Sequence, residues 1–398
     1  MQQDQLTEKV VHSISTSELE RRWFKVREIM KRERVDFLIF QSFADYFAGY
    51  VKWFTDIPAV HEYAVTVIFP KDDEMTMISH GSSDSSKAGT PPWMARGVKK
   101  RLSSPYMPSL NFTTHFEAEK VVNELSQYQS LRIGLLNEGA MSAGLVQGIR
   151  KNLKNVVFVD LTDEIDRIKA IKSPEEIERI RYSAYLHDRA MEACINATKP
   201  GVREFEIAAA GRYVCRMLGS EQQFILIGSA PAGSVVSYNH IHAMNRSIQY
   251  GDQVGILVEA NEPTGYYTHL HRTICVGKIP TELKENFEIV LEAQKLSLDL
   301  LKPGAVPLDL FNSNNEFMRQ HGLPEETRIY AHGQGVDLLE RPSLQPGETM
   351  IIEAGMNIAV HPEIITKGAK AQVCDNYIVT DSGVSECLHK TPKILIEV

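Results

Sequence analysis

The second half of the chain contains an internal repeat, and a repeat of whole helix–strand units strongly limits the folds it can adopt. One helical pattern ends in KPGV (199–202) and another ends in KPGA (302–305), 103 residues later. Each is followed by an acidic residue, a further helical pattern and apolar strands. Two helix–helix–strand halves predict a domain with pseudo-twofold symmetry and a site between its halves. The alternative is that KPG is only a common helix stop.

The first third of the chain alternates short apolar runs with helical patterns, which predicts an α/β unit with a mostly parallel sheet. A Pro-, Ser- and Gly-rich stretch, 81–110, is predicted to be a loop. Further on, the sequence SPEE (173–176) is a capping box that opens a long helix. We therefore predict two domains, an α/β domain over 1–164 and an α+β catalytic domain over 165–398. Strands are predicted at 35–40, 63–69, 75–79, 132–136 and 156–160, and helices at 17–33, 117–128 and 141–153.

Composition and charge argue against some classes of binding partner. The chain has 43 Lys and Arg against 51 Asp and Glu, a net charge of −8, which argues against nucleic-acid binding. It lacks a run of about 18 apolar residues, so we expect no membrane span and no membrane partner. The first residues show no apolar core of a signal peptide. Five scattered cysteines without a CxxC pair indicate reduced thiols and a cytoplasmic protein.

Histidines are the most informative polar residues of the second domain. Two pairs lie two residues apart, so each pair shares one face of an extended segment. Histidine is the commonest metal ligand and also an acid or base near neutral pH. Several converging on one cleft would therefore form a metal site or a proton-transfer site. The alternative is that each one is a hydrogen-bonded core or surface residue. The six candidates are His240, His242, His269, His271, His332 and His361.

Several segments in a fixed order resemble the pita-bread (M24-like) family, which includes methionine aminopeptidase, Xaa-Pro aminopeptidase, prolidase and creatinase. The resemblance implies a creatinase-like N-terminal domain, a pita-bread catalytic domain and a homodimer, as in creatinase and prolidase. The segments that carry it are IKSPEEIERIR, NHIHAMNRSIQYGD, GYYTHLHRT, AHGQG, IEAGMNIAVHP and CDNYIVTDSG.

This chain departs from the family at the metal ligands that the resemblance implies. The family's peptidases typically bind two divalent ions through two Asp, one His and two Glu. Their substrate-contacting histidine matches His240. The five ligand positions fall on Val258, with Glu259 beside it, on His269, on His332, on His361, and on Cys374, which Asp375 follows.

These substitutions argue against the usual dinuclear centre. A carboxylate has two oxygens that can span two ions, whereas an imidazole offers one lone pair. Three neutral imidazoles, those of His269, His332 and His361, suit a single Zn, Fe, Cu or Ni ion. Glu259, Cys374 and Asp375 are held in reserve as further ligands. A mononuclear, histidine-rich centre is the leading hypothesis.

The competing hypothesis needs no metal. Creatinase, in the same fold, uses a histidine as acid and base, and GYYTHLHRT is similar to its corresponding strand. His240 would then move the proton, while His332 with Glu259 or Glu262 would hold the substrate. The candidate substrate-binding residues are His242, Tyr266, His271, Arg272, Arg341 and Trp53. Their alternative roles are packing for Tyr266, pairing with a carboxylate for Arg272, and an exposed loop position for Trp53.

The best functional prediction is a hydrolase that cleaves a C–N bond in a small polar substrate. Its catalytic residues would be His240, His332 and Glu259. True Xaa-Pro peptidase activity is not expected, because the carboxylate set for two ions is missing. One alternative is a lyase, since a relative of this fold cleaves dimethylsulfoniopropionate by elimination. The other is a non-catalytic binding module, since the fold also serves in peptide binding.

Overall fold

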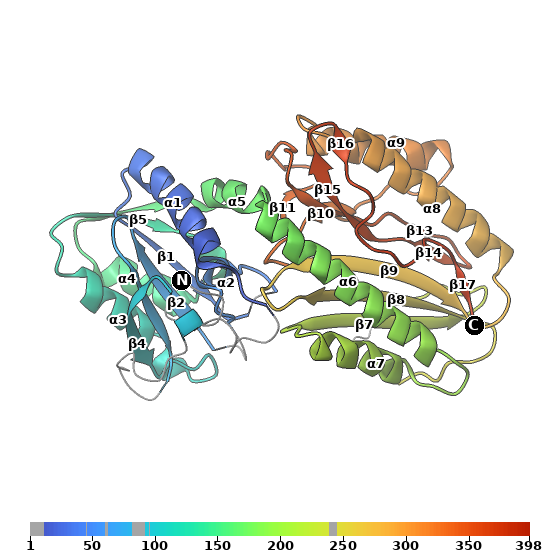
Figure 1. Ribbon diagram of the computed structural model, residues 1–398, viewed down its shortest axis with the longest axis horizontal. Coiled ribbons are helices and arrows are strands. Elements are labelled where there is room, and N and C mark those ends of the chain that lie inside the picture. Colours follow the sequence, from blue (N-terminus) through green and yellow to red (C-terminus); the bar gives the residue numbers. More distant parts are fainter. Residues whose placement is uncertain (1–11, 45, 60–62, 82–91, 95, 239–244) are drawn as a thin grey trace. The chain divides into compact units, whose positions relative to one another are not determined.

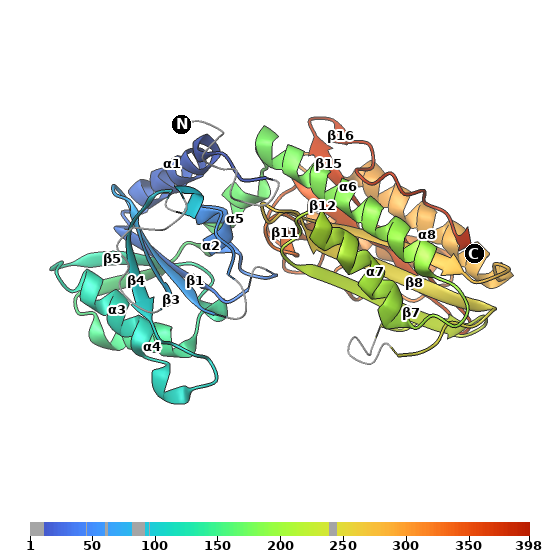
Figure 2. The same cartoon turned by 60° about the horizontal axis from the view of Figure 1, so that its bottom comes forward.

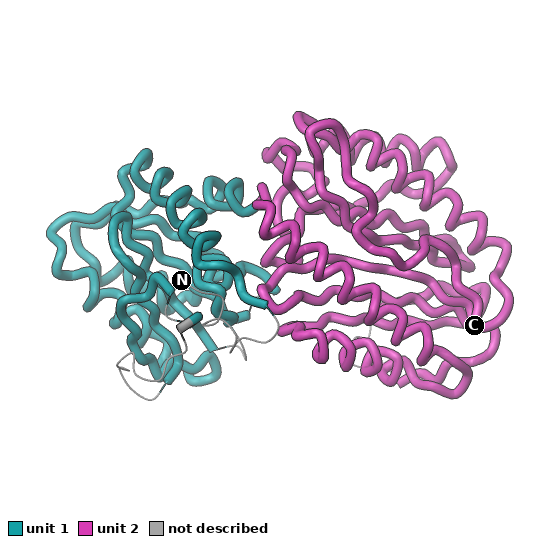
Figure 3. The backbone as a smooth tube through the Cα atoms, in the orientation of Figure 1, with its two compact units in different colours: residues 1–169 teal, residues 170–398 magenta. Residues whose placement is uncertain are grey.

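The structure is a computed structural model that describes residues 12–44, 46–59, 63–81, 92–94, 96–238 and 245–398. The chain divides into two compact units, residues 1–169 and residues 170–398 (Figure 3). The predicted domain boundary after residue 164 falls inside helix α5 (Thr162–Ala170), a few residues before this division. None of the described helices combines the length and the apolar character needed to cross a bilayer.

The first unit is built on a six-stranded sheet in the order β4-β3-β2-β1-β5-β6. The pairs β3–β4, β1–β5 and β5–β6 are parallel, while β2 is antiparallel to both β1 and β3. The sheet is therefore mixed, because β2 runs antiparallel to both of its neighbours. Its strands are β1 (Phe37–Ser42), β2 (Val65–Pro70), β3 (Met75–His80), β4 (Val98–Ser104), β5 (Leu131–Leu135) and β6 (Val156–Asp160).

The three predicted helices of this unit are present in the predicted order, and three further elements were not predicted. The segment predicted as a loop, 81–110, contains the edge strand β4, a short helix, α2, follows β1, and helix α5 lies at the predicted domain boundary. The α-helices before α5 are α1 (Thr16–Arg32), α2 (Tyr50–Thr55), α3 (Phe116–Leu125) and α4 (Ala143–Asn152), with 3₁₀ turns at η2 (Pro92–Met94), η3 (Asn111–Thr113) and η4 (Glu138–Ala140).

The second unit shows the two halves that the repeat predicts. Helices α6 and α7 lie along one sheet, and α8 and α9 lie along the other (Figures 1 and 2). Each KPG turn places its glycine, Gly201 or Gly304, at a φ of 88°, a left-handed conformation that favours glycine. The helices are α6 (Pro174–Ala197), α7 (Glu204–Met217), α8 (Thr281–Leu300) and α9 (Pro307–Gln320). The predicted capping box is present. The Ser173 side chain accepts from the Glu176 backbone N–H, and the Glu176 side chain accepts from the Ser173 backbone N–H.

Two sheets of this unit carry the candidate site residues. One has the order β17-β9-β8-β7 and the other β11-β10-β12-β15-β16. Strands β8 and β9 are buried at every position, which fits the apolar run VGILV (254–258) of β8. Strand β9, YTHLHRTIC, instead buries several polar side chains. A separate hairpin consists of β13 (Glu363–Ile365) and β14 (Lys370–Gln372). The sheet strands are β7 (Gln223–Pro231), β8 (Asp252–Asn261), β9 (Tyr267–Cys275), β10 (Ala331–Gly333), β11 (Glu340–Ser343), β12 (Asn357–Val360), β15 (Asp375–Thr380), β16 (Gly383–Val384) and β17 (Ile396–Glu397).

Candidate active site

Three of the predicted metal ligands meet in the second unit, and we call them the histidine triad. His269 lies on β9, His332 on β10, and His361 directly follows β12. The ring centroid of His361 is 5.0 Å from that of His269 and 5.1 Å from that of His332. One ring nitrogen from each residue lies within 4.8 Å of the other two. Strands of both sheets therefore contribute to one potential ligand set.

Strand pairing explains why the rings converge. The antiparallel pairing of β10 with β12 places His332 opposite Ala359, close to the end of β12 where His361 follows. The backbone N–H of His361 donates to the Tyr330 carbonyl at 2.8 Å, which extends this pairing by one step. In the other sheet, β8 and β9 place Glu259 directly opposite His269. The triad is thus fixed by the registers of two sheets.

The triad imidazoles are buried and neutral. Burial lowers the pKa of His332 to about 4. Burial and the neighbouring rings lower the pKa values of His269 and His361 well below their usual range. Both ring nitrogens of His269, and Nε2 of His361, lack a hydrogen-bond partner among the described residues. Because buried polar atoms are normally satisfied, these nitrogens suit a metal ion or a bound substrate.

Glu259 is the carboxyl group beside the triad. Its Oε1 lies 3.3 Å from Nδ1 of His269. Burial raises the pKa of Glu259 to about 8, so its carboxyl can gain or lose a proton near neutral pH. One carboxyl beside three imidazoles is fewer carboxylates than the two Asp and two Glu that the family resemblance implies for a pair of ions. The donor set therefore does not reproduce the ligand set of that dinuclear centre.

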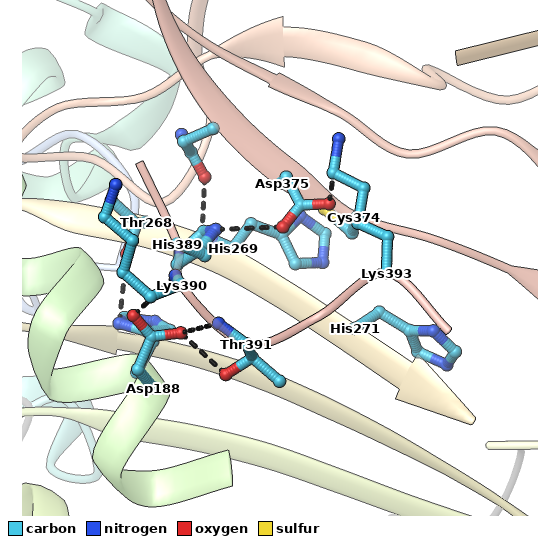
Figure 4. Close-up of polar contacts among 12 residues, drawn as sticks. Asp188, Thr268, His269, His271, Cys374, Asp375, His389, Lys390, Thr391 and Lys393 are labelled. Carbon is cyan, nitrogen blue, oxygen red and sulfur yellow. Dashed lines mark hydrogen bonds and ion pairs between the residues drawn. The ribbon is translucent and has the colours of Figure 1, made fainter. Parts of the chain in front are cut away.

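Asp375, a second predicted ligand, belongs to a different cluster (Figure 4). Its carboxylate accepts a 2.8 Å bond from Arg272 and lies 3.3 Å from Nδ1 of His389 and 3.8 Å from Nζ of Lys393. Burial alone would raise the pKa of Asp375, but the Arg272 guanidinium and His389 hold it at about 2. The carboxylate is thus already neutralised by a cation.

Other potential ligands near Asp375 are no better placed for a metal ion. Ligand atoms of Asp375, Cys387 and His389 lie within 4.8 Å of one another, yet the charges of Arg272 and Lys393 beside them oppose a further cation. Burial raises the pKa of the Cys374 thiol well above its usual range, so that thiol stays protonated. Neither Cys374 nor Asp375 is part of the triad cluster.

His271 has a partner at each ring nitrogen. Its Nε2 lies 2.7 Å from the Tyr238 hydroxyl, and its Nδ1 lies 3.1 Å from the Gln372 carbonyl. Since a carbonyl can only accept, Nδ1 carries the proton and Nε2 accepts from Tyr238. A Cβ on Gly255 would lie 2.2 Å from the Tyr238 hydroxyl, and one on Gly228 would lie 2.6 Å from the Ser237 carbonyl. Gly228 and Gly255 are paired across β7 and β8, and their lack of side chains leaves room for the segment that contains Ser237 and Tyr238.

The remaining predicted site residues are engaged elsewhere or lie outside the described residues. The Tyr266 hydroxyl donates to Glu176 at 2.5 Å, and Arg341 pairs with Glu348 at 2.5 Å. Trp53 lies in α2 of the first unit with 1% of its surface exposed, so it is not the exposed loop aromatic considered above. The predicted proton-moving residue His240, and His242, lie outside the described residues.

Three buried amides that were not predicted as site residues, Gln334, Asn357 and Asn376, lie on or next to strands β10, β12 and β15. All are at most 1% exposed and hydrogen-bonded to one another. Asn357 and Asn376 stand at or next to the start of the strand segments NIAV and DNYIVT, so no local pattern singled them out.

Comparison with known proteins agrees with this architecture. The chain is 29% identical to a Xaa-Pro dipeptidase of Pyrococcus furiosus over 302 residues, covering 73% of this chain and 85% of the relative. It is 26% identical to a creatinase of a Bacillus species over 370 residues, covering 90% of this chain and 86% of the relative. A prolidase structure from Thermococcus sibiricus superposes with a TM-score of 0.77 at 20% identity, over 97% of this chain and all of that one, which shows the pita-bread fold.

The family is shown by a match that spans just over half of the chain. Residues 178–381, which include all three triad histidines and Glu259, match the model of metallopeptidase family M24. The expectations of a pita-bread fold and of an M24-type hydrolase are confirmed at this level. The chain belongs to metallopeptidase family M24.

Proposed function

We propose that this protein hydrolyses a C–N bond in a small polar substrate and that its site holds no more than one divalent ion. The observation that carries the proposal is the meeting of three neutral imidazoles beside Glu259, two of which, those of His269 and His361, stand where the family keeps carboxylates. The dipeptidase and creatinase among its relatives support C–N bond cleavage. The missing bridging carboxylates separate it from ordinary Xaa-Pro peptidases.

The residues would divide the work between binding and proton transfer. His269, His332 and His361 would hold one Zn, Fe, Cu or Ni ion, which when bound polarises a water molecule or a substrate oxygen. Glu259 Oε1 takes a proton from the attacking water and returns it to the leaving nitrogen. Its pKa of about 8 suits both transfers near neutral pH.

A metal-free variant of the same reaction is the second candidate. The observation that favours it is the 3.3 Å separation of Glu259 Oε1 and His269 Nδ1. A carboxyl–imidazole pair can accept and return a proton without an ion. In that variant, the unsatisfied nitrogens of the triad would bind the polar atoms of the substrate directly.

Elemental analysis of the purified protein, combined with activity before and after chelation, tests the proposal. We expect at most one divalent ion per chain. Full activity without any ion would select the metal-free variant, and two tightly bound ions would overturn the single-ion site. Substrates are sought in a panel of small amides and guanidino compounds, with Xaa-Pro dipeptides as a comparison.

Product analysis in heavy-oxygen water separates the reaction classes. Hydrolysis places one solvent oxygen in the product, whereas elimination by a lyase places none. Absence of turnover combined with tight ligand binding would favour the binding module. Elimination or mere binding would contradict the proposed function.

Two further predictions complete this proposal, namely a homodimer and a cytoplasmic location. All five cysteines are free, which suits a reducing compartment. Light scattering of the purified protein measures the oligomeric state, and cell fractionation tests the location.

A further inference from the structure

The buried amides Gln334, Asn357 and Asn376 form a connected network behind the histidine triad. Asn376 Oδ1 accepts a 2.7 Å bond from the backbone N–H of His269. Asn376 Nδ2 donates to Gln334 Oε1 at 2.8 Å and to Asn357 Oδ1 at 3.0 Å. Asn357 Nδ2 in turn donates to the Gln334 carbonyl at 3.1 Å. Asn376 therefore uses both of its amide hydrogens and an oxygen lone pair.

This pattern fixes the orientation of the Asn376 amide. The backbone N–H of His269 can only donate, so an oxygen of Asn376 must face it. The nitrogen then faces two amide oxygens, both of which accept. Gln334 completes its own bonding by donating from Nε2 to the Leu338 carbonyl at 2.9 Å. A fully satisfied buried network of this kind restricts the arrangement of the strands that carry it.

The network touches each strand that supplies a triad histidine. His269 itself is bonded on β9, Gln334 lies two residues after His332, and Asn357 begins β12, four residues before His361. Since β9 belongs to one sheet and β10 and β12 to the other, Asn376 links the two sheets at the triad. From these contacts we infer that Asn376, with Gln334 and Asn357, is a positioning group that sets the spacing of the triad.

The inference rests on the proposed function, because it assigns the network a role in the reaction carried out at the triad. A purely structural role would resemble that of Asn315, another buried asparagine of the same unit. Asn315 donates to the Glu326 carbonyl at 3.1 Å and accepts from the Glu326 N–H at 2.7 Å. It lies on α9 and has no bond to a triad strand. Asn315 therefore provides the matched control.

The test compares Asn376→Asp with Asn315→Leu in the full chain. Aspartate still accepts from the His269 N–H, but it opposes its second oxygen to Gln334 Oε1 and Asn357 Oδ1. We expect Asn376→Asp to lower kcat about 10- to 100-fold, as for other groups that orient site residues, with KM changed less than about threefold. Asn315→Leu should leave both constants within about twofold of the wild type. Gln334→Met, which removes the side-chain bonds to Asn376 and to the Leu338 carbonyl, replaces Asn376→Asp if that variant does not fold.

A second readout does not depend on activity. In protein carrying ¹³C-labelled histidine, the imidazole resonances of His269, His332 and His361 report their surroundings by NMR. We expect all three to shift in Asn376→Asp, including that of His361, which has no direct bond to the network, and none to shift in Asn315→Leu. A shift confined to His269, or an unchanged spectrum, would overturn the positioning role. If the wild type hydrolyses no C–N bond, the proposed function fails, while the NMR comparison still decides this inference.

Discussion

Two clusters in the second unit each combine buried histidine with a buried carboxyl group and differ in their charge balance. In the histidine triad, Nε2 of His269 and Nε2 of His361 have no hydrogen-bond partner among the described residues, and the pKa of the adjacent Glu259 is raised to about 8. Around Asp375, a buried carboxylate is bonded to Arg272, and its pKa is lowered to about 2. Residue type alone therefore does not identify a metal ligand. A buried group that already has its counter-charge stabilises the fold, whereas one that lacks it is available to a ligand.

The largest expected effect follows replacement of a triad histidine. His361→Leu should lower kcat/KM for the proposed hydrolysis by about 10²- to 10⁴-fold, because it removes a group that holds or protonates the reacting atoms. Stability should change little, since the replaced Nε2 has no hydrogen bond to lose. His389→Leu, in the Asp375 cluster, is the matched control and should keep kcat/KM within about threefold. Equal losses of kcat/KM in both variants would show that the histidine triad and the Asp375 cluster do not differ in their importance for activity.

Breaking the Asp375 pair should mainly reduce stability. Asp375→Ala leaves the Arg272 guanidinium buried without its carboxylate and should lower the free energy of unfolding by about 3–5 kcal/mol. Urea denaturation measures the loss. The double variant Asp375→Leu with Arg272→Met, which removes both charges, should recover part of it. A loss below about 1 kcal/mol in Asp375→Ala would show that the pair does not stabilise the fold.

The two carboxyls should give opposite dependences of stability on pH. The folded pKa of Glu259 is raised from 4.5 to about 8, so its contribution is lost as pH rises from 4.5 through 8, by at most about 1.4 kcal/mol per pH unit. The folded pKa of Asp375 is lowered from 3.8 to about 2, so its contribution is lost as pH falls through 2.

Urea denaturation of the wild type and of Glu259→Gln between pH 6.5 and 8 isolates the Glu259 term. The buried histidines, whose folded pKa values are lowered, also contribute in this window, but they are the same in both proteins. The stability of the wild type relative to Glu259→Gln should therefore fall with rising pH. A slope unchanged by Glu259→Gln would contradict the raised pKa.

The smallest expected effect concerns Lys393, the outer cation of the Asp375 cluster. Its Nζ lies 3.8 Å from Asp375, and 28% of its side chain is exposed. Because solvent screens such a pair, Lys393→Met should change the free energy of unfolding by less than about 1 kcal/mol. A loss above about 2 kcal/mol, measured by the same denaturation, would mean that Lys393 stabilises the fold more than a screened pair can, through Asp375 or through its bonds to Gln294 and Tyr377.

Much of the fold could be predicted from sequence, because periodic apolar patterns mark most helices and strands. Three elements of the first unit were not predicted, namely α2, β4 and the helix α5 at the predicted domain boundary. Helix α2 is only six residues long and buried on every side, so it shows no amphipathic period. Strand β4, VKKRLSS, lies at an edge of the sheet and keeps charged residues toward solvent, which hides its pattern.

The candidate site was only partly predictable. The triad histidines stood out because each matches a ligand position of the family. Arg272 pairs with Asp375, which lies 103 positions further along the chain. From the sequence alone, Arg272 could also have contacted the substrate, and Asp375 could have bound a metal ion. The roles of His240 and His242 stay predictions. Asn376 was missed because its importance depends on cross-strand neighbours, which local patterns do not reveal.

The facing glycines of β7 and β8 have a consequence for protein engineering. Because Gly228 and Gly255 have no side chains, Tyr238 packs directly against their main chain, and its hydroxyl bonds to His271. Even an alanine at Gly255 would push the phenol ring outward and detach it from the imidazole. Mutant libraries that aim to reshape this enzyme should therefore leave both positions untouched and vary the bulkier residues around them.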